Sequence, residues 1–183
     1  YFILFKPKDV VSGDFYWAAA TTSKNSVTDS SNNNFYLAVA DSTGHGVPGA
    51  IMSILNIACL DKAITEGITS PELILNETRR LIIENLKNDG SEDGGKDGMD
   101  GSLLRFDFEN KVLHCASANS PIWIVRTSIS SDKNELIEIK PDRMPIGKHE
   151  KDNISFTLHT VNLQKDDVVY CLTDGLPDQF GGP

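Results

Sequence analysis

Short apolar runs alternate along the chain with polar, turn-rich segments. Residues 1–5, 13–20 and 35–40 are rich in aromatic and aliphatic side chains, which predicts three strands. The third run, FYLAVA, is apolar throughout, so we expect both of its faces to be covered. The polar segment at residues 23–34 predicts a hairpin connection between the second and third strands.

Two helices are predicted after the third strand. From residue 47 to about residue 65, apolar side chains recur at the spacing of a helix. A second helix is predicted from Pro71 to about Leu86, because Ser70 suits the N-cap and proline suits the first helical position. The segment that follows, residues 88–101, is too polar and glycine-rich to contribute to a packed core.

The rest of the chain reads as short strands separated by turns. These strands are predicted at residues 102–108, 112–118, 121–126, 136–140, 154–161 and 167–173. Two strands, two helices and a further run of strands indicate an α+β protein with helices packed on a large sheet or sandwich. Strands and helices do not alternate, which argues against a doubly wound nucleotide-binding fold.

Composition narrows the function classes. The chain has 183 residues, enough for one domain with a sizeable core, and its 39% hydrophobic content is ordinary for a globular protein. The formal net charge of −9 argues against sequence-independent binding of nucleic acid and suits a site that collects metal cations. No apolar run reaches about 18 residues, so we expect no membrane span.

The cysteines Cys59, Cys115 and Cys171 lie far apart among apolar residues, with neither metal-ligand nor redox spacing. We expect them to be buried and reduced. The first residue is Tyr1 rather than methionine, and we expect the chain to be a piece of a longer protein.

Three acidic residues stand where an apolar strand meets a turn of small residues: Asp14, Asp41 and Asp174. A buried carboxylate must be paired, hydrogen-bonded or bound to metal. Each acid could cap its local turn, as aspartate does in Asx-turns. Alternatively, the three together form a site for a hard cation such as Mg²⁺ or Mn²⁺, which prefers oxygen ligands.

A second cation site is an alternative in the acidic loop. Six positions of this loop fall at the spacing of an EF-hand calcium site: Asp89, Ser91, Asp93, Gly94, Asp97 and Asp100. Lys96 replaces a residue that is usually apolar, and the following residues read as a strand rather than a helix. A solvated acidic loop is the preferred interpretation.

Several segments resemble, in order, the blocks of the SpoIIE/RsbU-like serine phosphatases, a bacterial branch of the metal-dependent (PPM) protein phosphatases. The segments are KPKDVVSGDFYW at 6–17, AVADSTGHGVPGAIMSILN at 38–56, KDGMDGSLL at 96–104, ASANSPIWIVR at 116–126, MPIGKHE at 144–150 and DDVVYCLTDGLPDQFGGP at 166–183. The resemblance implies a single phosphatase domain across residues 1–183. It also implies an α/β/β/α sandwich in which helix pairs flank two central, mainly antiparallel sheets.

The resemblance also implies a site for two Mn²⁺ or Mg²⁺ ions. By position in the blocks, Asp14 belongs to the metal cluster, Asp41 bridges both ions, Ser42 offers its backbone carbonyl, and Asp174 binds the second ion. A water molecule activated by the ions would attack the phosphorus, with Asp41 and Asp174 as the catalytic acids. His45 is predicted to contact phosphate or to protonate the leaving oxygen, with a structural role in the turn as the alternative. Lys6 is a further candidate for a contact with phosphate, and a solvated surface lysine is the preferred alternative.

The family usually continues beyond the segment at 166–183 with helices and a further metal-binding aspartate. We therefore expect the natural domain to be longer, and the second ion to bind weakly without that residue. The resemblance implies a phosphorylated STAS-type anti-sigma-factor antagonist, or a similar phosphoprotein, as the substrate. It places this domain in the cytoplasm, with the full-length protein free or membrane-tethered, and leaves homodimer formation open. The alternatives are an inactive signalling module of the same fold and, less favoured, a metal-dependent nuclease.

Overall fold

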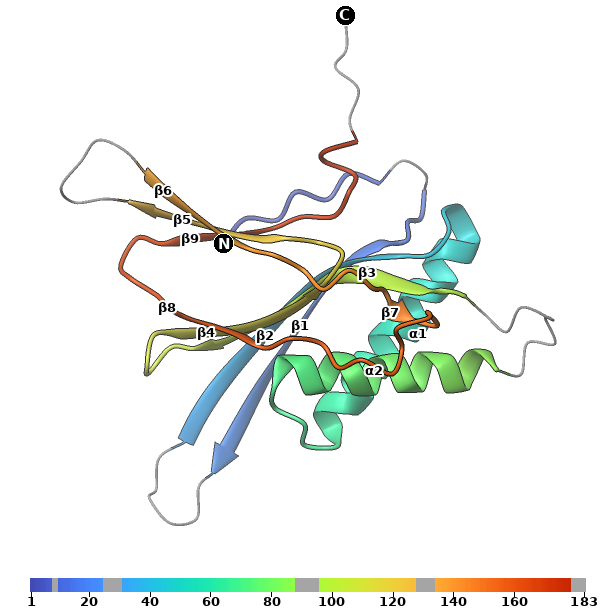
Figure 1. Ribbon diagram of the computed structural model, residues 1–183, viewed down its shortest axis with the longest axis horizontal. Helices are drawn as coiled ribbons and strands as arrows, with labels where there is room; N and C mark the ends of the chain where they lie inside the picture. Colours follow the sequence, from blue (N-terminus) through green and yellow to red (C-terminus); the bar gives the residue numbers. More distant parts are fainter. Residues whose placement is uncertain (8–9, 25–30, 88–95, 128–133, 179–183) are drawn as a thin grey trace, which may run out of the picture.

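The computed structural model describes residues 1–7, 10–24, 31–87, 96–127 and 134–178 (Figure 1). Its two described helices are α1 (Gly46–Thr65) and α2 (Pro71–Leu86). The strands before the helices are β1 (Asp14–Lys24) and β2 (Ser31–Ser42). The strands after them are β3 (Gly98–Asp107), β4 (Val112–Ala118), β5 (Ile122–Thr127), β6 (Asn134–Ile139), β7 (Ile146–Gly147), β8 (His159–Asn162) and β9 (Val168–Cys171).

The strands form two antiparallel sheets. The first has the order β1-β2-β3-β4-β8, with β7 paired to β3, and the second has the order β6-β5-β9. Both helices lie on the side of the first sheet that faces away from the second, so the described chain forms a helix layer, a sheet and a second sheet (Figure 1). The predicted α+β class with two antiparallel sheets is confirmed.

Two apolar cores hold these layers together. The larger one joins the first sheet to the helices and includes Tyr36, Leu60, Ile74 and Leu103, all fully buried. The smaller one lies between the sheets and consists of Leu104, Leu113, Cys115, Ile122, Ile124 and Ile139. Neighbouring residues on β3 thus serve opposite cores, because successive side chains of a strand point to opposite faces.

Helix α1 packs on the sheet through small and polar residues. Its buried positions include Gly49, Ser53, Asn56, Leu60 and Ala63, which follow helical spacing. The helix was predicted from its apolar periodicity, but Ile51 and Ile54 are 61% and 68% exposed. By length and composition alone α1 could cross a membrane, a property that core helices of globular domains share.

Three predictions about strands differ from the structure. Strand β3 begins at Gly98 rather than at residue 102, and Met99, in the segment expected to lie outside the core, is buried in the larger core because the strand pairing continues through it. Residues 1–5 form no strand: their side chains are exposed, and Phe5 only makes an edge contact with the ring of Tyr16. The strand predicted at 154–161 shortens to β8, because side chains take up the backbone groups before it. The amide of Phe156 donates to Asn76, and the amide of Thr157 donates to Asp142.

The predicted helix ends are close to those observed. Helix α2 begins at Pro71 as predicted, although Ser70 donates its hydroxyl hydrogen to Glu72 rather than capping the backbone. The cysteines are free, as predicted, with Cys59 and Cys115 buried and Cys171 partly buried. Four of the positions proposed for a calcium loop (89, 91, 93 and 94) lie outside the described residues, and Asp100 lies within β3.

Candidate functional site

Strands β1 and β2 bring two of the predicted acids together. Asp14 is the first residue of β1 and lies directly opposite Asp41, the next-to-last residue of β2. Directly opposed residues of an antiparallel pair project to the same face, with Cβ atoms roughly 4.5–5.5 Å apart. The two carboxylates therefore share one face at one end of the first sheet.

The turn after β2 surrounds these acids with backbone oxygens. A Cβ atom on Gly13 would lie 2.6 Å from the carbonyl oxygen of Ser42, 2.8 Å from that of Gly44 and 3.1 Å from Asp41 Oδ1. A Cβ atom on Gly49 would lie 2.4 Å from the same Gly44 oxygen. Glycine is thus required at both positions because the carbonyl oxygens of the turn pack against them. Gly13, Gly44 and the two acids also line a small hollow beside the turn.

Hydrogen bonds from side chains of α1 hold the turn on the side that faces the helix. The Ser42 hydroxyl is 3.1 Å from that of Ser53 and accepts a hydrogen bond from the Asn56 amide at 2.9 Å. Ser53 also donates to the carbonyl oxygen of Gly13 at 2.7 Å. The Ser42 side chain thus points into the protein, which is compatible with the prediction that only its carbonyl would meet a metal. Ser53 and Asn56 were not predicted, since serine and asparagine inside a helix carry no local signal of such contacts.

The start of β3 holds the turn from the other side. The Thr43 amide donates to the carbonyl oxygen of Gly98 at 3.0 Å, and the Gly98 amide donates to the Thr43 hydroxyl at 3.0 Å. The strand that carries Asp41 is therefore held on both sides, and the position of its carboxylate is well defined.

Burial and the neighbouring acids both affect Asp41. Burial, together with the charges of Asp14, Asp174 and Asp100, raises the pKa of Asp41 to about 6. One oxygen of Asp14, Oδ1, is buried and has no hydrogen-bond partner among the described residues. An unsatisfied buried carboxylate oxygen is costly, and a cation would remove the cost.

The third predicted acid comes from the second sheet. Asp174 lies in the exposed turn that follows β9, and its charge acts on both Asp41 and Asp100. Within the part of the chain that the structure describes, no group of three or more His, Cys, Asp or Glu side chains is placed so that it could hold a metal ion. The charges of these acids therefore influence one another, but their side chains alone do not form a complete set of metal ligands.

His45 and Lys6, the residues predicted to contact phosphate, lie at different places relative to the acids. His45 is the N-cap residue of α1 and lines a cavity of about 160 Å³ together with Asp14 and Asp41. Lys6 lies exposed in the N-terminal segment and is not among the described residues that line this cavity. The structure thus brings His45 to the acids, and the role of Lys6 stays a prediction.

One acid at this place was considered from the sequence only as a position of the alternative calcium loop. Asp100 on β3 lies directly opposite Asp41, on the side away from Asp14, and accepts a hydrogen bond from the Asn119 amide at 2.9 Å. The sequence placed Asp100 in an acidic loop, because only the strand register reveals its neighbour. Its GMDGS context was part of the family resemblance and was the available signal.

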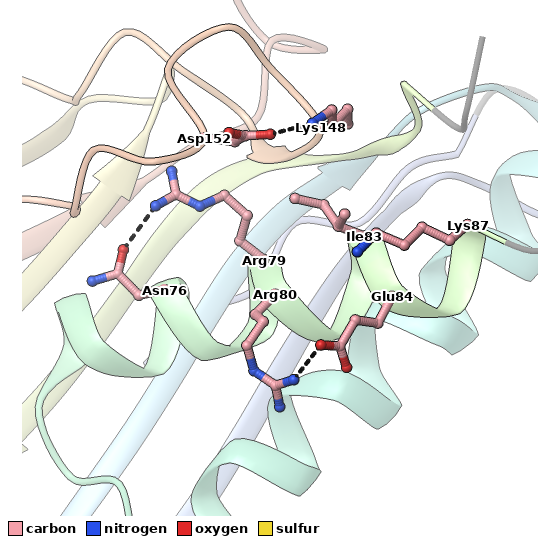
Figure 2. A pocket seen from close by; sticks show the side chains of 8 residues that line it. All are labelled: Asn76, Arg79, Arg80, Ile83, Glu84, Lys87, Lys148 and Asp152. Carbon is pink, nitrogen blue, oxygen red and sulfur yellow. Dashed lines mark hydrogen bonds and ion pairs between the residues drawn. The ribbon is translucent and has the colours of Figure 1, made fainter.

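A larger cavity, about 300 Å³, lies between α2 and the segment around Lys148 (Figure 2). Several of its charged groups pair with near neighbours: Lys148 pairs with Asp152 at 2.8 Å, and Arg80 pairs with Glu84 at 2.6 Å. Arg79 donates to Asn76 at 3.0 Å and stacks over the ring of Phe156. None of the predicted site residues lines this cavity. Contacts of Asn76 and Arg79 with Phe156 connect α2 to the segment before β8.

The chemistry of the donor set fits a hard divalent cation. Asp14 and Asp41 provide carboxylate oxygens, the turn provides the carbonyl oxygens of Ser42 and Gly44, and one oxygen of Asp14 is unsatisfied. Mg²⁺ and Mn²⁺ bind oxygen ligands of this kind and retain several water molecules. The cavity beside the acids leaves room for such waters.

A sequence model of a protein family and several solved structures match the chain. A sequence model of the family described as Stage II sporulation protein E (SpoIIE) matches residues 31–182. The chain is 32% identical to the SiaA-PP2C domain of Pseudomonas aeruginosa, with a TM-score of 0.78, over 100% of this chain and 63% of that one. It therefore spans less than two thirds of that structure. No curated protein sequence matches the chain.

Two more distant structures share the fold. The structure of the RsbU and RsbW domains of a Mycobacterium tuberculosis protein is 21% identical, with a TM-score of 0.69, over 96% of this chain and 42% of that one. The structure of RsbX in complex with magnesium is also 21% identical, with a TM-score of 0.63, over 94% of this chain and 71% of that one.

Proposed function

Because the chain belongs to the SpoIIE family and has the fold of the PP2C phosphatase domains, we propose that it is a metal-dependent phosphatase of phosphoserine and phosphothreonine in proteins. One observation on this chain supports the proposal in addition to its family membership. Asp14 and Asp41 lie side by side at the edge of an oxygen-lined hollow, with Asp174 close enough for its charge to act on Asp41.

Asp14, Asp41, Asp174 and the Ser42 carbonyl are the groups that would hold two Mn²⁺ or Mg²⁺ ions. When bound, such ions supply a water molecule of lowered pKa and offset the charge of the phosphoryl oxygens. Asp41 is suited to the central position, since strands on both sides fix its backbone. The small residues of the turn leave space for a phosphate group beside it.

His45 lies at the edge of the same cavity. We assign it a hydrogen bond to the phosphate group or the protonation of the leaving serine oxygen. Its position at the start of α1 also serves the turn itself, so a His45 variant separates the two roles only if folding is measured alongside activity.

For the substrate, the proposal is a phosphorylated STAS-type anti-sigma-factor antagonist or a similar signalling phosphoprotein. Its support is the similarity to RsbU-type and SiaA-type domains. A second candidate is a catalytically weak or inactive binding module of the same fold. It is favoured by one observation, the open ligand set among the described side chains.

Phosphate release from a synthetic phosphoserine peptide, with and without Mn²⁺, separates the two candidates. We expect Mn²⁺-dependent release that EDTA abolishes and that Asp41→Asn lowers by orders of magnitude. Glu109→Gln makes the same change of charge at an exposed turn and is the matched control, with unchanged activity. Wild-type activity in Asp41→Asn would refute the mechanism, and no release from the unmodified chain would favour the binding module.

A further inference from the structure

Asp41 has an acidic neighbour on each side of its strand. Because β2 lies between β1 and β3, Asp41 is directly opposite Asp14 on one side and Asp100 on the other. Opposed residues project to the same face, so three carboxylates stand in a row across three strands. Of the nearby carboxylates, only Asp14, Asp41 and Asp174 were assigned to the cation site above, which leaves Asp100 without a role.

Such a row is unfavourable without a compensating charge. Like charges directly opposite each other destabilise a sheet. None of the described lysine or arginine side chains forms an ion pair with Asp14, Asp41 or Asp100. The buried, unsatisfied Oδ1 of Asp14 at the end of the row is an independent sign of a missing positive partner.

The turn after β4 holds Asp100 in a defined orientation. Asn119 adopts a left-handed backbone conformation, with φ of 56°, and donates its side-chain amide to Asp100 Oδ1 at 2.9 Å. The backbone of this turn is fixed as well: the Asn119 amide donates to the carbonyl oxygen of Asp142, and the Asp142 amide donates to that of Ser117. The other oxygen of Asp100 has no hydrogen-bond partner among the described residues.

Asp174, in the turn after β9 of the second sheet, is near enough to the row for its charge to act on it. Its charge raises the pKa of Asp100 in addition to the larger effect of burial, as it does for Asp41. Asp100 therefore shares its neighbourhood with both acids that are expected to hold the second ion.

We propose that Asp100 is a further carboxylate ligand of the cation site, binding directly or through water, and that Asn119 is its positioning residue. The proposal rests on the proposed function only for the existence of a divalent-cation site between Asp41 and Asp174. Asn119 occupies one oxygen of Asp100 and orients the other toward the cation, the arrangement by which outer groups commonly orient metal ligands.

Direct Mn²⁺ binding, measured by calorimetry, tests the proposal without reference to activity. We expect Asp100→Asn to weaken binding by about tenfold or more, and Asn119→Ala to weaken it by about tenfold. Glu109→Gln is the control, because Glu109 is exposed and lies in the turn between β3 and β4. This variant should bind Mn²⁺ as the wild type does. Wild-type affinity in Asp100→Asn would overturn the proposal.

Thermal unfolding distinguishes a ligand from a residue that only supports the turn. In EDTA, Asp100→Asn should unfold at the same or a higher temperature than the wild type, because the change removes repulsion from the row. The rise in unfolding temperature on adding Mn²⁺ should be smaller in the variant. A lower unfolding temperature in EDTA with an undiminished Mn²⁺ effect would show a purely structural role.

The two proposals fail in different ways. If the chain binds Mn²⁺ through Asp41 and Asp100 but releases no phosphate, the proposed phosphatase function is wrong and the ligand assignment stands. If phosphate is released and Asp100→Asn binds Mn²⁺ normally, the ligand assignment alone is wrong.

Discussion

The two sheets contribute to the site in different ways. The first sheet has helices on one face and the second sheet on the other, and it holds Asp14, Asp41 and Asp100 at fixed register, each half-buried. The second sheet is covered by described residues on its inner face only, and its other face exposes Leu136, Val168 and Tyr170. Its acid, Asp174, lies in an exposed turn. Burial and charge repulsion are therefore larger for the three acids of the first sheet than for Asp174 after the second sheet.

The largest expected effect is on catalysis, where both sheets should matter. Asp41→Asn and Asp174→Asn should each lower the rate of phosphate release by about a thousandfold, since each loses metal-derived stabilisation of the transition state worth roughly 4 kcal/mol. The sheets should differ in stability. In EDTA, Asp41→Asn should stabilise the folded chain because it removes repulsion and burial of charge, whereas Asp174→Asn should change the free energy of unfolding by less than about 0.5 kcal/mol.

Equal stability of the two variants in EDTA would contradict this distinction between the sheets. Chemical denaturation without metal, run alongside the phosphate assay, measures both quantities on the same preparations.

The next effect concerns glycine. Gly13→Ala in the first sheet's site would force backbone carbonyl oxygens apart, and we expect a loss of about 3 kcal/mol of folding stability. Gly175→Ala, next to Asp174, meets only the Thr173 hydroxyl at 3.8 Å and should cost less than about 0.5 kcal/mol. The free energy of unfolding in urea provides the comparison, and a large loss in Gly175→Ala would show that the turn after β9 is as tightly packed as the first site.

The smallest effect concerns the ion pair that fastens the second sheet. Arg126 on β5 donates two hydrogen bonds to Asp167, at 3.0 and 2.8 Å, and the Asp167 side chain is 2% exposed. Asp167→Asn should cost about 2 kcal/mol at neutral pH. Asp107→Asn, a change of the same kind at the partly exposed end of β3, should cost about 0.5 kcal/mol or less.

This ion pair also predicts a dependence on pH. The hydrogen bonds and charge of Arg126 lower the pKa of Asp167, so the pair stabilises the folded chain fully above the ordinary carboxyl pKa of about 4. The contribution is lost as the pH falls through the lowered pKa. The difference in stability between the wild type and Asp167→Asn should therefore shrink in acid, and a constant difference between pH 7 and pH 2 would refute the assignment.

Local signals were sufficient for much of the fold. Strand β4 and helix α2 were predicted with their observed ends, because alternation, Pro71 and the turn residues act within a few positions. Residues 1–5 have the composition of a strand but no backbone partner in the described structure, and composition alone does not reveal a missing partner. Strand β8 is shorter than predicted because distant side chains, Asn76 and Asp142, bind the backbone before it.

The site was predictable where residues near in sequence form it and unpredictable where strand pairing does. Asp41 and its turn are one continuous segment, and Asp14 was found from its place where a predicted strand meets a small residue, with its role supplied by the family block. The link between Asp100 and Asp41 depends on the register of β2 with β3, and that between Asp100 and Asn119 on the turn after β4. Ser53 and Asn56 were missed because hydrogen bonds to the turn, rather than apolar spacing, determine the inward face of α1 near the site.

The position of Asp174 after β9 has a mechanical consequence. Asp41 ends the central part of one sheet and Asp174 follows the last described strand of the other, so a single ion held by both would cross-link the layers. Such a clamp would tie the apolar contacts between the sheets to the presence of the ion. Loading the site would then make the two layers unfold as one cooperative unit, and stripping it would let the outer layer loosen first.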